Sequence, residues 1–566
     1  MYGRENTIIK AQRRIALNIT MKKTLIFLFI LLTRIFGMII LASAILANQI
    51  GLDNDTKWGL GRLLIIIIGI LVLLSPSIYQ YFQNLKIQAG LVVVLILMMY
   101  VWQVSFGRWT DWPKTSNYFD RLATAFQHRQ VSIPTKPDPS LLALKDPYDL
   151  ELRTKAGVPF LWDLSLYKGN YYLYWGPVPA LLMEPIKFFY TDEIGDQGVT
   201  FWFLSGMLIV NCLLAFAVWR DYFNDLPVWL FILGVTVLGT INPIPWLLHH
   251  GETYQAAISA GQFFLMSGLY WLYFAFNHDQ PKILNIFIAS VLFTGALGSR
   301  FILILPIGYI LIMFSIKLYR ENYLYFATLW NRIIPAIALP LAVGIIGLAY
   351  YNWIRFDSVF DFGIKYQIND INYINGYTFF SISYLPANIY NYFFLPFRMQ
   401  MKYLFLKALL AKEYMAFGFP IPEAYYPEKM SGILLASPFV TLAGISIYTL
   451  INKNSIKKDL WWLIITLSGV TALSMGPILL YFFGTMRFIE DFMPSLAMLS
   501  LIGFWQGYKF LRQSRLRWAY TITSVAISIA TIIIGVVLAL SSSNKVPIFI
   551  PPIIMDWFRS FFTSAK

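Results

Sequence analysis

The sequence predicts an all-α polytopic membrane protein, and three observations carry this prediction. Apolar residues make up 58% of the chain and charged residues only 13%, with a mean hydropathy of +0.60, well outside the soluble globular range. Apolar runs of about twenty residues, the length needed to cross the hydrocarbon core of a bilayer, recur along the chain. Basic residues stand in short clusters between these runs. The net charge of +15 therefore reflects membrane topology, and we expect no nucleic-acid partner.

We predict about thirteen transmembrane helices, with a range of 11 to 14. Their centres lie near residues 36, 69, 97, 209, 236, 265, 291, 309, 342, 441, 470, 500 and 530. The first apolar run, residues 24–47, is too long for a signal-peptide core and follows a basic segment, so we expect a cytoplasmic N-terminus and an uncleaved first span. The order of the spans then places nearly every later basic cluster in the cytoplasm, as the positive-inside rule requires. The single Cys212 lies inside an apolar run and indicates neither a disulfide framework nor a thiol metal site.

The same topology places five polar segments on the outer side of the membrane. They are residues 107–191, 242–253, 298–301, 352–430 and 484–491. The two long ones are too aromatic to be disordered and too long to be simple connections, which indicates a function. Within them, residues 176–190 and 384–410 are apolar but interrupted by proline, so we expect interfacial helices that do not cross the membrane.

This topology divides the chain into five parts. Residues 1–106 hold the cytoplasmic tail and three spans, and residues 107–191 form a first large extracytoplasmic loop, predicted to be catalytic. Core transmembrane helices follow over 192–351, a second large extracytoplasmic segment over 352–430, and the last helices with an outer tail over 431–566.

Carboxylates in the first outer segment are the candidates for acid-base chemistry. Asp111 and Asp120 follow the third span closely, and Asp163 precedes a tyrosine-rich, strand-like run. A carboxylate held at the membrane surface can act as a general base or can hold a divalent cation. The alternative for each is a solvated loop charge. Asp146 and Asp149, in Asp-Pro-Tyr-Asp, are more typical of turns.

A second acidic position lies in the motif His-His-Gly-Glu, residues 249–252. Glu252 opens the sixth predicted span from the outer side, where the helix dipole favours a negative charge. Glu252 and His250 are candidates for binding an acceptor or a metal ion. The alternative is a helix-terminal charge beside interfacial histidines, because adjacent histidines rarely chelate one ion without further ligands.

Two arginines stand at outer ends of predicted spans, against the charge rule. Arg300 and Arg487 have the planar, forked guanidinium that grips phosphate oxygens through paired hydrogen bonds. The alternative is a salt bridge, and for Arg487 the neighbouring Glu490 and Asp491 favour that alternative.

Aromatic residues from Tyr167 to Trp175 are candidates for stacking on sugar rings, with Tyr172 and Trp175 foremost. Interfacial tyrosine and tryptophan belts are the alternative. We find no phosphate-binding loop, dinucleotide glycine motif, metal-binding histidine pair on a helix or Gly-x-Ser-x-Gly elbow at a convincing place, so we do not expect cytoplasmic nucleotide chemistry.

Taken together, these features resemble the GT-C superfamily of membrane glycosyltransferases. The resemblance lies in residues 118–126, 146–149, 162–180, 298–300, 351–356 and 487–494. It departs from the family where many members carry an adjacent acidic pair, because this chain has Thr115 and Ser116 there. Two additional spans before the first outer loop are a second departure.

The resemblance implies transfer of a sugar from a polyprenyl-phosphate donor to a cell-envelope acceptor at the outer face of a bacterial inner membrane. Asp120, Asp163 or Asp111 would serve as the base, and Arg300 and Arg487 would bind the lipid phosphate. A divalent cation, Mg or Mn, is compatible with this reaction and is not required by it. The alternatives are a transporter or flippase of lipid-linked or anionic solutes, and a polysaccharide polymerase or ligase.

Overall fold

The computed structural model describes residues 31–50, 60–74, 84–112, 114–276, 281–320, 329–374, 376–399, 406–410, 418, 420–451 and 457–541. The described chain is mostly helical, with a few short strands. It divides into two compact units, of which the first comprises residues 1–91, 105–112 and 548–566 and the second residues 92–104 and 113–547. The predicted N-terminal tail and C-terminal outer tail lie outside the described residues.

The first unit contains a helix at Leu31–Ile45 and α2 (Leu60–Leu74). Two glycines bring these helices together: a Cβ atom on Gly37 would lie 2.8 Å from the backbone nitrogen of Leu73, and one on Gly69 would lie 2.6 Å from the side chain of Leu41. Small residues therefore allow close packing of two apolar helices, as is common in membrane proteins.

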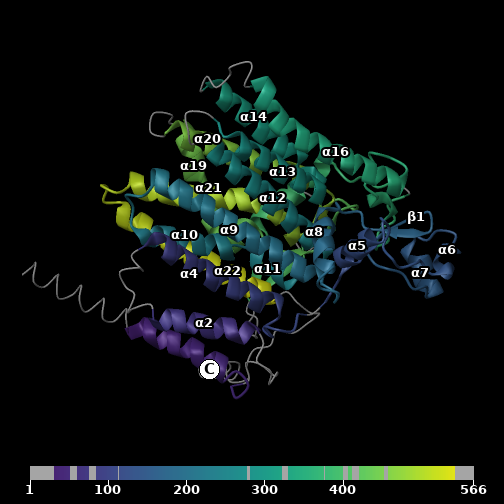
Figure 1. Ribbon diagram of the computed structural model, residues 1–566, viewed down its shortest axis with the longest axis horizontal. Coiled ribbons are helices and arrows are strands. Elements are labelled where there is room, and N and C mark those ends of the chain that lie inside the picture. Colours follow the sequence, from purple (N-terminus) through teal and green to yellow (C-terminus); the bar gives the residue numbers. More distant parts are fainter. Residues whose placement is uncertain are drawn as a thin grey trace, which may run out of the picture. The chain divides into compact units, whose positions relative to one another are not determined.

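The long helices of the second unit run in roughly the same direction (Figure 1). They are α4 (Leu85–Val104, from residue 92), α9 (Asp196–Tyr222), α10 (Val228–Thr240), α12 (Thr253–Ala275), α13 (Ile283–Ser299), α14 (Ile304–Arg320), α16 (Ile334–Phe356), α19 (Ala443–Ile451), α20 (Lys458–Leu479), α21 (Met493–Phe510) and α22 (Arg517–Ser541). Shorter helical segments connect them, namely α11 (Ile244–His249), η2 (Phe301–Leu303), η3 (Leu329–Ile333), η4 (Ile364–Tyr366), α18 (Ile433–Ala436), η8 (Pro438–Leu442) and η10 (Met486–Asp491).

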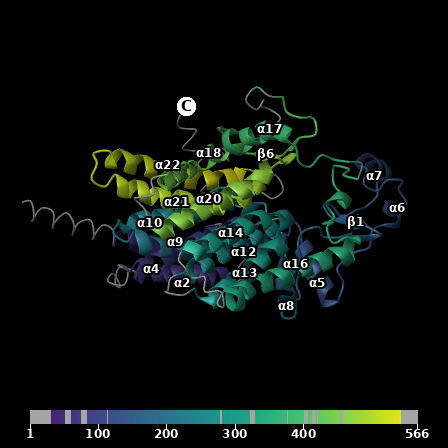
Figure 2. The ribbon, with the colours of Figure 1, turned by 90° about the horizontal axis from the view of Figure 1, so that it is seen from above.

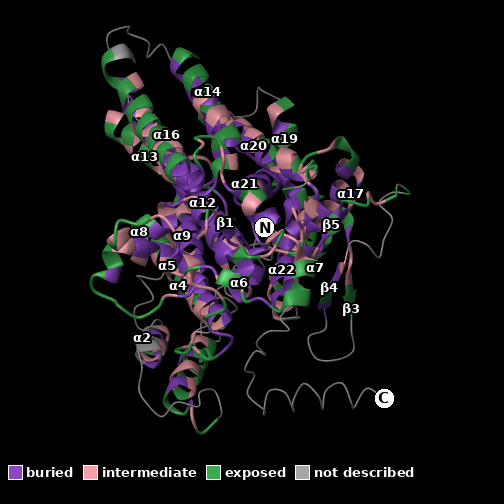
Figure 3. Ribbon diagram, turned by 90° about the vertical axis from the view of Figure 1, so that its right-hand side faces the viewer, coloured by how far each residue is buried: buried purple, intermediate pink, exposed green. Residues whose placement is uncertain are grey.

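Helix α12 is largely buried, and it packs against α9 and α13. Figure 3 shows exposed residues at the ends of α14 and α16 that lie farthest from it. Its small residues explain the close packing, since a Cβ atom on Gly268 would lie 2.4 Å from the ring of Phe293 and one on Gly261 would lie 3.1 Å from Cβ of Arg300.

Each of the thirteen predicted span centres falls in a described helical segment. Seven helices in the described chain are long and apolar enough to cross a membrane. They are Leu85–Val104, Asp196–Tyr222, Val228–His249, Phe301–Arg320, Asn331–Phe356, Lys458–Leu479 and Arg517–Leu540. The prediction of a helical membrane protein is thus supported, and the total of thirteen crossings stays a prediction.

The predicted first outer loop folds into short elements that gather at one end of the second unit in both Figure 1 and Figure 2. They are α5 (Tyr118–Gln127), α6 (Pro139–Leu142), α7 (Leu150–Ala156), β1 (Ser165–Tyr167), β2 (Asn170–Tyr172) and α8 (Val178–Lys187). The strand-like run is a hairpin, in which Lys168 and Gly169 both have positive φ, as a tight two-residue turn requires.

Helix α8 agrees with the prediction that residues 176–190 do not cross the membrane. Its ten residues span about 15 Å, half of the hydrocarbon thickness. Leu181, Leu182, Phe188 and Phe189 are exposed on and just after this helix.

The expected interfacial helix over residues 384–410 is only half correct. Helical turns occupy η5 (Ile382–Tyr384), α17 (Leu385–Ile389) and η6 (Tyr390–Phe394), but β3 (Phe397–Met399) and β4 (Leu406–Leu410) then form an antiparallel pair. Pro396 explains the change, because a proline there removes a backbone donor from any continuing helix.

Backbone pairing joins the second long segment to two other predicted outer segments. Strand β5 (Tyr426–Pro427) pairs in parallel with β7 (Phe483–Gly484), and β6 (Lys429–Met430) pairs with β4. Ser165 forms an isolated bridge with Gln367. Backbone hydrogen bonds thus connect three of the predicted outer segments to one another.

Candidate functional site

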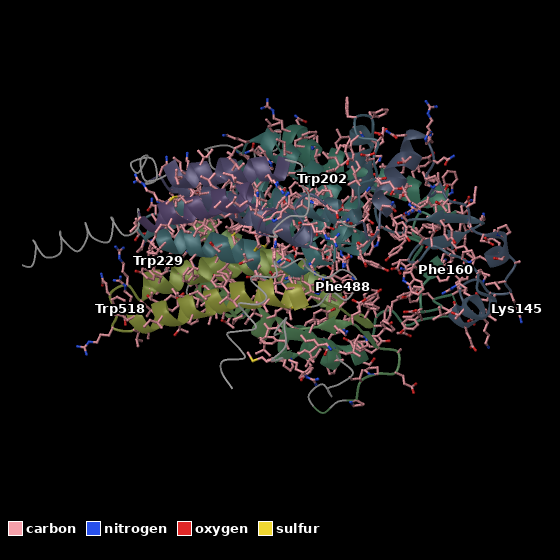
Figure 4. The ribbon with its side chains drawn as sticks, turned by 90° about the horizontal axis from the view of Figure 1, so that it is seen from below. Lys145, Phe160, Trp202, Trp229, Phe488 and Trp518 are labelled. Atoms are coloured by element: carbon pink, nitrogen blue, oxygen red, sulfur yellow. The ribbon has the colours of Figure 1, made fainter. Side chains whose placement is uncertain are left out.

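A cavity of about 720 Å³ lies within the second unit. All five predicted outer segments contribute to its wall, through Trp162, Glu252, Arg300, Asp370 and Arg487 among others. In Figure 4, Phe488, which also lines the cavity, lies between the end of the unit marked by Trp229 and Trp518 and the end marked by Phe160 and Lys145. The polar segments that the topology groups on one side thus meet around a single space.

Asp163 is the predicted catalytic carboxylate that reaches this cavity. It precedes β1 in the left-handed conformation, with φ of 62°. Its backbone N–H donates to the carbonyl of Ile368 at 2.9 Å, and Oδ1 accepts a hydrogen bond from Nε2 of Gln367 at 3.1 Å. The same amide group donates to the hydroxyl of Tyr254 at 2.8 Å. Contacts from two distant segments therefore orient the Asp163 side chain.

Burial raises the pKa of Asp163 to about 6. A hydrogen bond from Tyr254 and the charge of Arg487 oppose this rise, whereas Glu252 and Glu428 add to it. A carboxyl group with this pKa is mostly ionised at neutral pH and is a stronger base than an ordinary aspartate. Asp163 therefore has the environment of a general base.

Glu252 lies where the sequence predicts it, at the N-cap position of α12, and it lines the cavity. His250 does not line the cavity: its ring stacks on Trp246 with centroids 4.3 Å apart, and Nδ1 lies 3.0 Å from the carbonyl oxygen of Trp246. In the described part of the chain, no group of three or more histidine, cysteine or acidic residues could hold a metal ion. The prediction that Glu252 and His250 bind a metal ion therefore gains no support.

Arg300 ends α13 at the cavity wall. Its Nη2 donates to Oδ2 of Asp491 at 2.5 Å, and its guanidinium carbon lies 5.2 Å from the ring of Trp175 and 5.4 Å from that of Phe488. Both members of the ion pair are buried. The pair and the two rings fix the position of the cation.

Arg487 pairs with Glu428, with Nη1 at 3.0 Å from Oε1 and 2.8 Å from Oε2. The sequence favours Glu490 and Asp491 as its partners, and this prediction is wrong. Asp491 pairs instead with Arg300, and Glu490 is fully buried. Burial, together with the charge of Asp491, raises the pKa of Glu490 well above its usual range, which favours its neutral form.

Aromatic rings hold the Arg487 guanidinium in place. Its central carbon lies 4.4 Å from the ring of Tyr254 and 5.3 Å from that of Phe483. Burial lowers the pKa of Arg487 and Glu428 raises it, with a net rise, so the side chain stays charged in this apolar setting.

Asp120 does not line the cavity. It forms a buried ion pair with Lys187, in which Oδ1 lies 2.9 Å from Nζ, and it accepts a hydrogen bond from the backbone N–H of Ile194 at 3.1 Å. This arrangement ties α5 to the end of α8 and favours a structural role.

Asp111 belongs to the first unit, where its exposed carboxylate lies 3.0 Å from Nη1 of Arg108, as expected of a solvated loop charge.

The two aromatic candidates for sugar stacking differ in whether they line the cavity. Trp175 lines the cavity beneath Arg300, whereas Tyr172 is buried edge-on against Phe356 with ring centroids 5.5 Å apart.

Asp146 and Asp149 confirm the prediction of turn formers. Asp149 caps α7 by accepting hydrogen bonds from the N–H groups of Glu151 and Leu152, and Asp146 accepts one from the N–H of Tyr148.

Ser116, at the position of the expected acidic pair, binds a buried carboxylate of α9. Ser116 Oγ donates to Oδ2 of Asp196 at 2.6 Å, and Thr253 Oγ1 donates to the same atom at 2.6 Å. Asp196 also accepts hydrogen bonds from the N–H groups of Tyr118 and Phe119. The buried carboxylate of Asp196 on α9 thus accepts hydrogen bonds from the start of α5 and from the start of α12. Two of its donors are hydroxyl groups, those of Ser116 and Thr253.

Sequence reasoning missed several polar residues of the cavity, among them Tyr254, Gln367, Asp370 and Glu428. Tyr254 follows the motif of residues 249–252, and a pattern search around Glu252 would include it. The other three stand in the second long outer segment, where local patterns carry no signal because their roles depend on contacts with distant residues.

The cavity thus combines a basic carboxylate, two guanidiniums, aromatic rings and an apolar wall that includes Ile302, Leu305 and Leu348. The described chain thus has the apolar helices of a membrane protein and a cavity in which these groups meet. No family model, no curated protein and no solved structure matches the chain.

Proposed function

We propose that this protein is an integral membrane glycosyltransferase of the GT-C type. It transfers a sugar from a polyprenyl-phosphate donor to a cell-envelope acceptor at the outer face of a bacterial inner membrane. The observation that carries the proposal is the presence of Asp163, Arg300 and Arg487 in one cavity. A base and two phosphate-binding cations are what a direct displacement at a sugar phosphate needs.

In this reaction Asp163 takes the proton from the acceptor group. The acceptor oxygen or nitrogen forms a bond to the anomeric carbon, while the bond between that carbon and the phosphate oxygen breaks. The electron pair stays on the phosphate. The raised pKa of Asp163 supports the role, because a stronger base removes a proton from a weakly acidic hydroxyl more readily.

Arg300 and Arg487 stabilise the charge that develops on the departing lipid phosphate. Both are charged and largely buried, and both are held by aromatic rings. Cations that are already positioned in a site of low dielectric stabilise such charge without reorganisation during the reaction.

Aromatic and apolar parts of the cavity accommodate the rest of the donor. Trp175 presents a ring on which the C–H face of a sugar stacks. The wall formed by Ile302, Leu305 and Leu348 suits the first part of a polyprenyl chain. Glu252 is assigned to the acceptor side, and neither a divalent cation nor His250 is needed.

The test is transfer of radiolabelled sugars from polyprenyl phosphates to a cell-envelope extract by the purified full chain in detergent. We expect transfer by the wild type and its loss in Asp163→Asn and Arg300→Gln. Thermal unfolding of each variant shows whether the fold is retained.

The rival functions predict other results. Binding of the lipid-linked donor without turnover, followed by its movement between leaflets of proteoliposomes, would support a transporter or flippase and contradict the proposal. Products of increasing length from a single acceptor would support a polysaccharide polymerase.

A further inference from the structure

Each guanidinium of the cavity already has a carboxylate partner. Arg300 is paired with Asp491, and Arg487 is paired with Glu428. An incoming anion therefore meets two cations that the protein has itself neutralised. It must share a cation with the resident carboxylate or replace that carboxylate.

The two resident carboxylates differ in accessibility. The side chain of Asp491 is 1% exposed, and that of its partner Arg300 is 8% exposed. The side chain of Glu428 is 35% exposed and lines the cavity, opposite an Arg487 side chain that is 11% exposed. Both arginines line the cavity, but of their two partner carboxylates Glu428 lines it and Asp491 does not, so an anion there can replace Glu428 directly.

The backbone of Glu428 is held independently of its side chain. Its N–H donates to the carbonyl of Gly484 at 2.7 Å, next to the paired strands β5 and β7. Among the described residues, the carboxylate accepts hydrogen bonds from Arg487 and from the hydroxyl of Thr485, which donates to Oε2 at 2.6 Å. Rotation of one side chain is therefore enough to free the arginine.

Contacts that do not involve Glu428 also hold Arg487. Tyr254 and Phe483 contact the guanidinium independently of the carboxylate. The Nη1 group, which donates to both oxygens of Glu428, is then available to another pair of oxygens in the same place.

We infer that Glu428 is an internal competitor, a carboxylate that occupies Arg487 in the empty site and is replaced by the phosphate oxygens of a phosphate-bearing ligand. The ligand class is a phosphate monoester or diester, because two oxygens on one phosphorus match the two carboxylate oxygens that Arg487 now holds. The inference rests on the proposed function for the identity of the ligand, and it concerns binding alone.

Glu428→Gln tests this inference. The amide keeps the size and a hydrogen-bonding partner for Thr485 but no longer neutralises Arg487. The dissociation constants of farnesyl phosphate and of inorganic pyrophosphate are measured by titration calorimetry on the full chain in detergent. We expect binding about tenfold tighter in the variant, equivalent to about 1.4 kcal/mol.

Asp370→Asn is the matched control, since it removes one negative charge from the same cavity without touching an arginine. The carboxylate of Asp370 accepts a hydrogen bond from the Tyr426 hydroxyl at 3.2 Å. A gain in affinity that occurs only in Glu428→Gln supports the replacement of Glu428 by phosphate. An equal gain in both variants would show that the loss of any negative charge from the cavity is sufficient, and it would overturn the inference. Unchanged or weaker binding in Glu428→Gln also overturns it.

A gain for farnesyl phosphate alone identifies a lipid phosphate as the ligand, and an equal gain for both probes identifies any phosphate. If Glu428→Gln unfolds, Glu428→Asp carries the test, because its shorter carboxylate withdraws from Arg487 and should also tighten binding. Tighter binding in a protein that transfers no sugar would support the inference and contradict the proposed function.

Discussion

The Arg300 guanidinium donates to the Asp491 carboxylate at 2.5 Å, although 191 positions separate the two residues. This contact joins the end of α13 to η10, and both side chains are buried. It places the Arg300 cation at the wall of the cavity, where the buried carboxylate of Asp491 balances its charge. The stability of the fold and the proposed binding of phosphate therefore involve the same residue, Arg300.

Replacement of Arg300 should separate these two roles. Arg300→Gln leaves Asp491 as a buried charge without a cation, and breaking such a pair costs about 3–5 kcal/mol. We expect a lower melting temperature in detergent and loss of sugar transfer. The double variant Arg300→Gln/Asp491→Asn should recover much of the melting temperature, because no buried charge remains, and should still fail to transfer. Recovery of transfer in the double variant would show that Arg300 acts only through the fold.

Asp163→Asn should lower the rate of transfer by about 10²–10⁴-fold, the usual contribution of a general base. The amide still accepts a hydrogen bond from Gln367, so the melting temperature should change little. Asp357→Asn is the control, because this exposed carboxylate pairs with Lys168 at 2.7 Å and does not line the cavity. Equal activity of the Asp163 variant and the control would remove Asp163 from the chemistry.

The rate of transfer should depend on pH through the pKa of Asp163. Only the ionised carboxylate accepts a proton, and its pKa is about 6, so the rate should rise as the pH increases through 6 and level off above it. Tyr254→Phe removes a hydrogen bond that lowers this pKa, so the rising limb should move to higher pH. A shift to lower pH, or no shift, would contradict the proposed contact between Tyr254 and the base.

Asp120 should matter for stability and not for chemistry. Asp120→Ala leaves Lys187 as a buried cation without a carboxylate partner, so we expect a loss of about 3–5 kcal/mol in the free energy of unfolding. Asp120→Leu/Lys187→Met removes both charges and should be more stable than the single variant. Transfer per folded molecule, measured below the melting temperature, should stay near the wild-type value in the double variant.

Much of the fold follows from the sequence because the period and length of apolar runs are local properties. The predicted span centres all fall in helical segments, and the tyrosine-rich run predicted to be strand-like forms the hairpin of β1 and β2. The prediction of a helix over residues 384–410 is wrong in its second half, because it used the same local signal as the span predictions. Its apolar content alone indicates a helix, whereas Pro396 and pairing with β6 determine the strands.

Within the site, the sequence selects residue types and the fold selects partners. Asp120 and Asp163 are both candidate bases in the sequence, but Asp163 lines the cavity, whereas Asp120 lies elsewhere in a buried ion pair with Lys187. Arg487 stands next to Glu490 and Asp491 along the chain and yet binds Glu428 from a different segment.

The sequence by itself determined the class of protein, the grouping of the polar segments and the chemical types of the candidate groups. Hydrophobicity and charge distribution depend on the composition and spacing of residues, which can be obtained from the sequence alone. Only the tertiary structure decided which candidate carboxylate lines the cavity and which carboxylate pairs with each arginine. These choices depend on burial and on distances of about 3 Å between residues far apart in the sequence, and no local pattern encodes them.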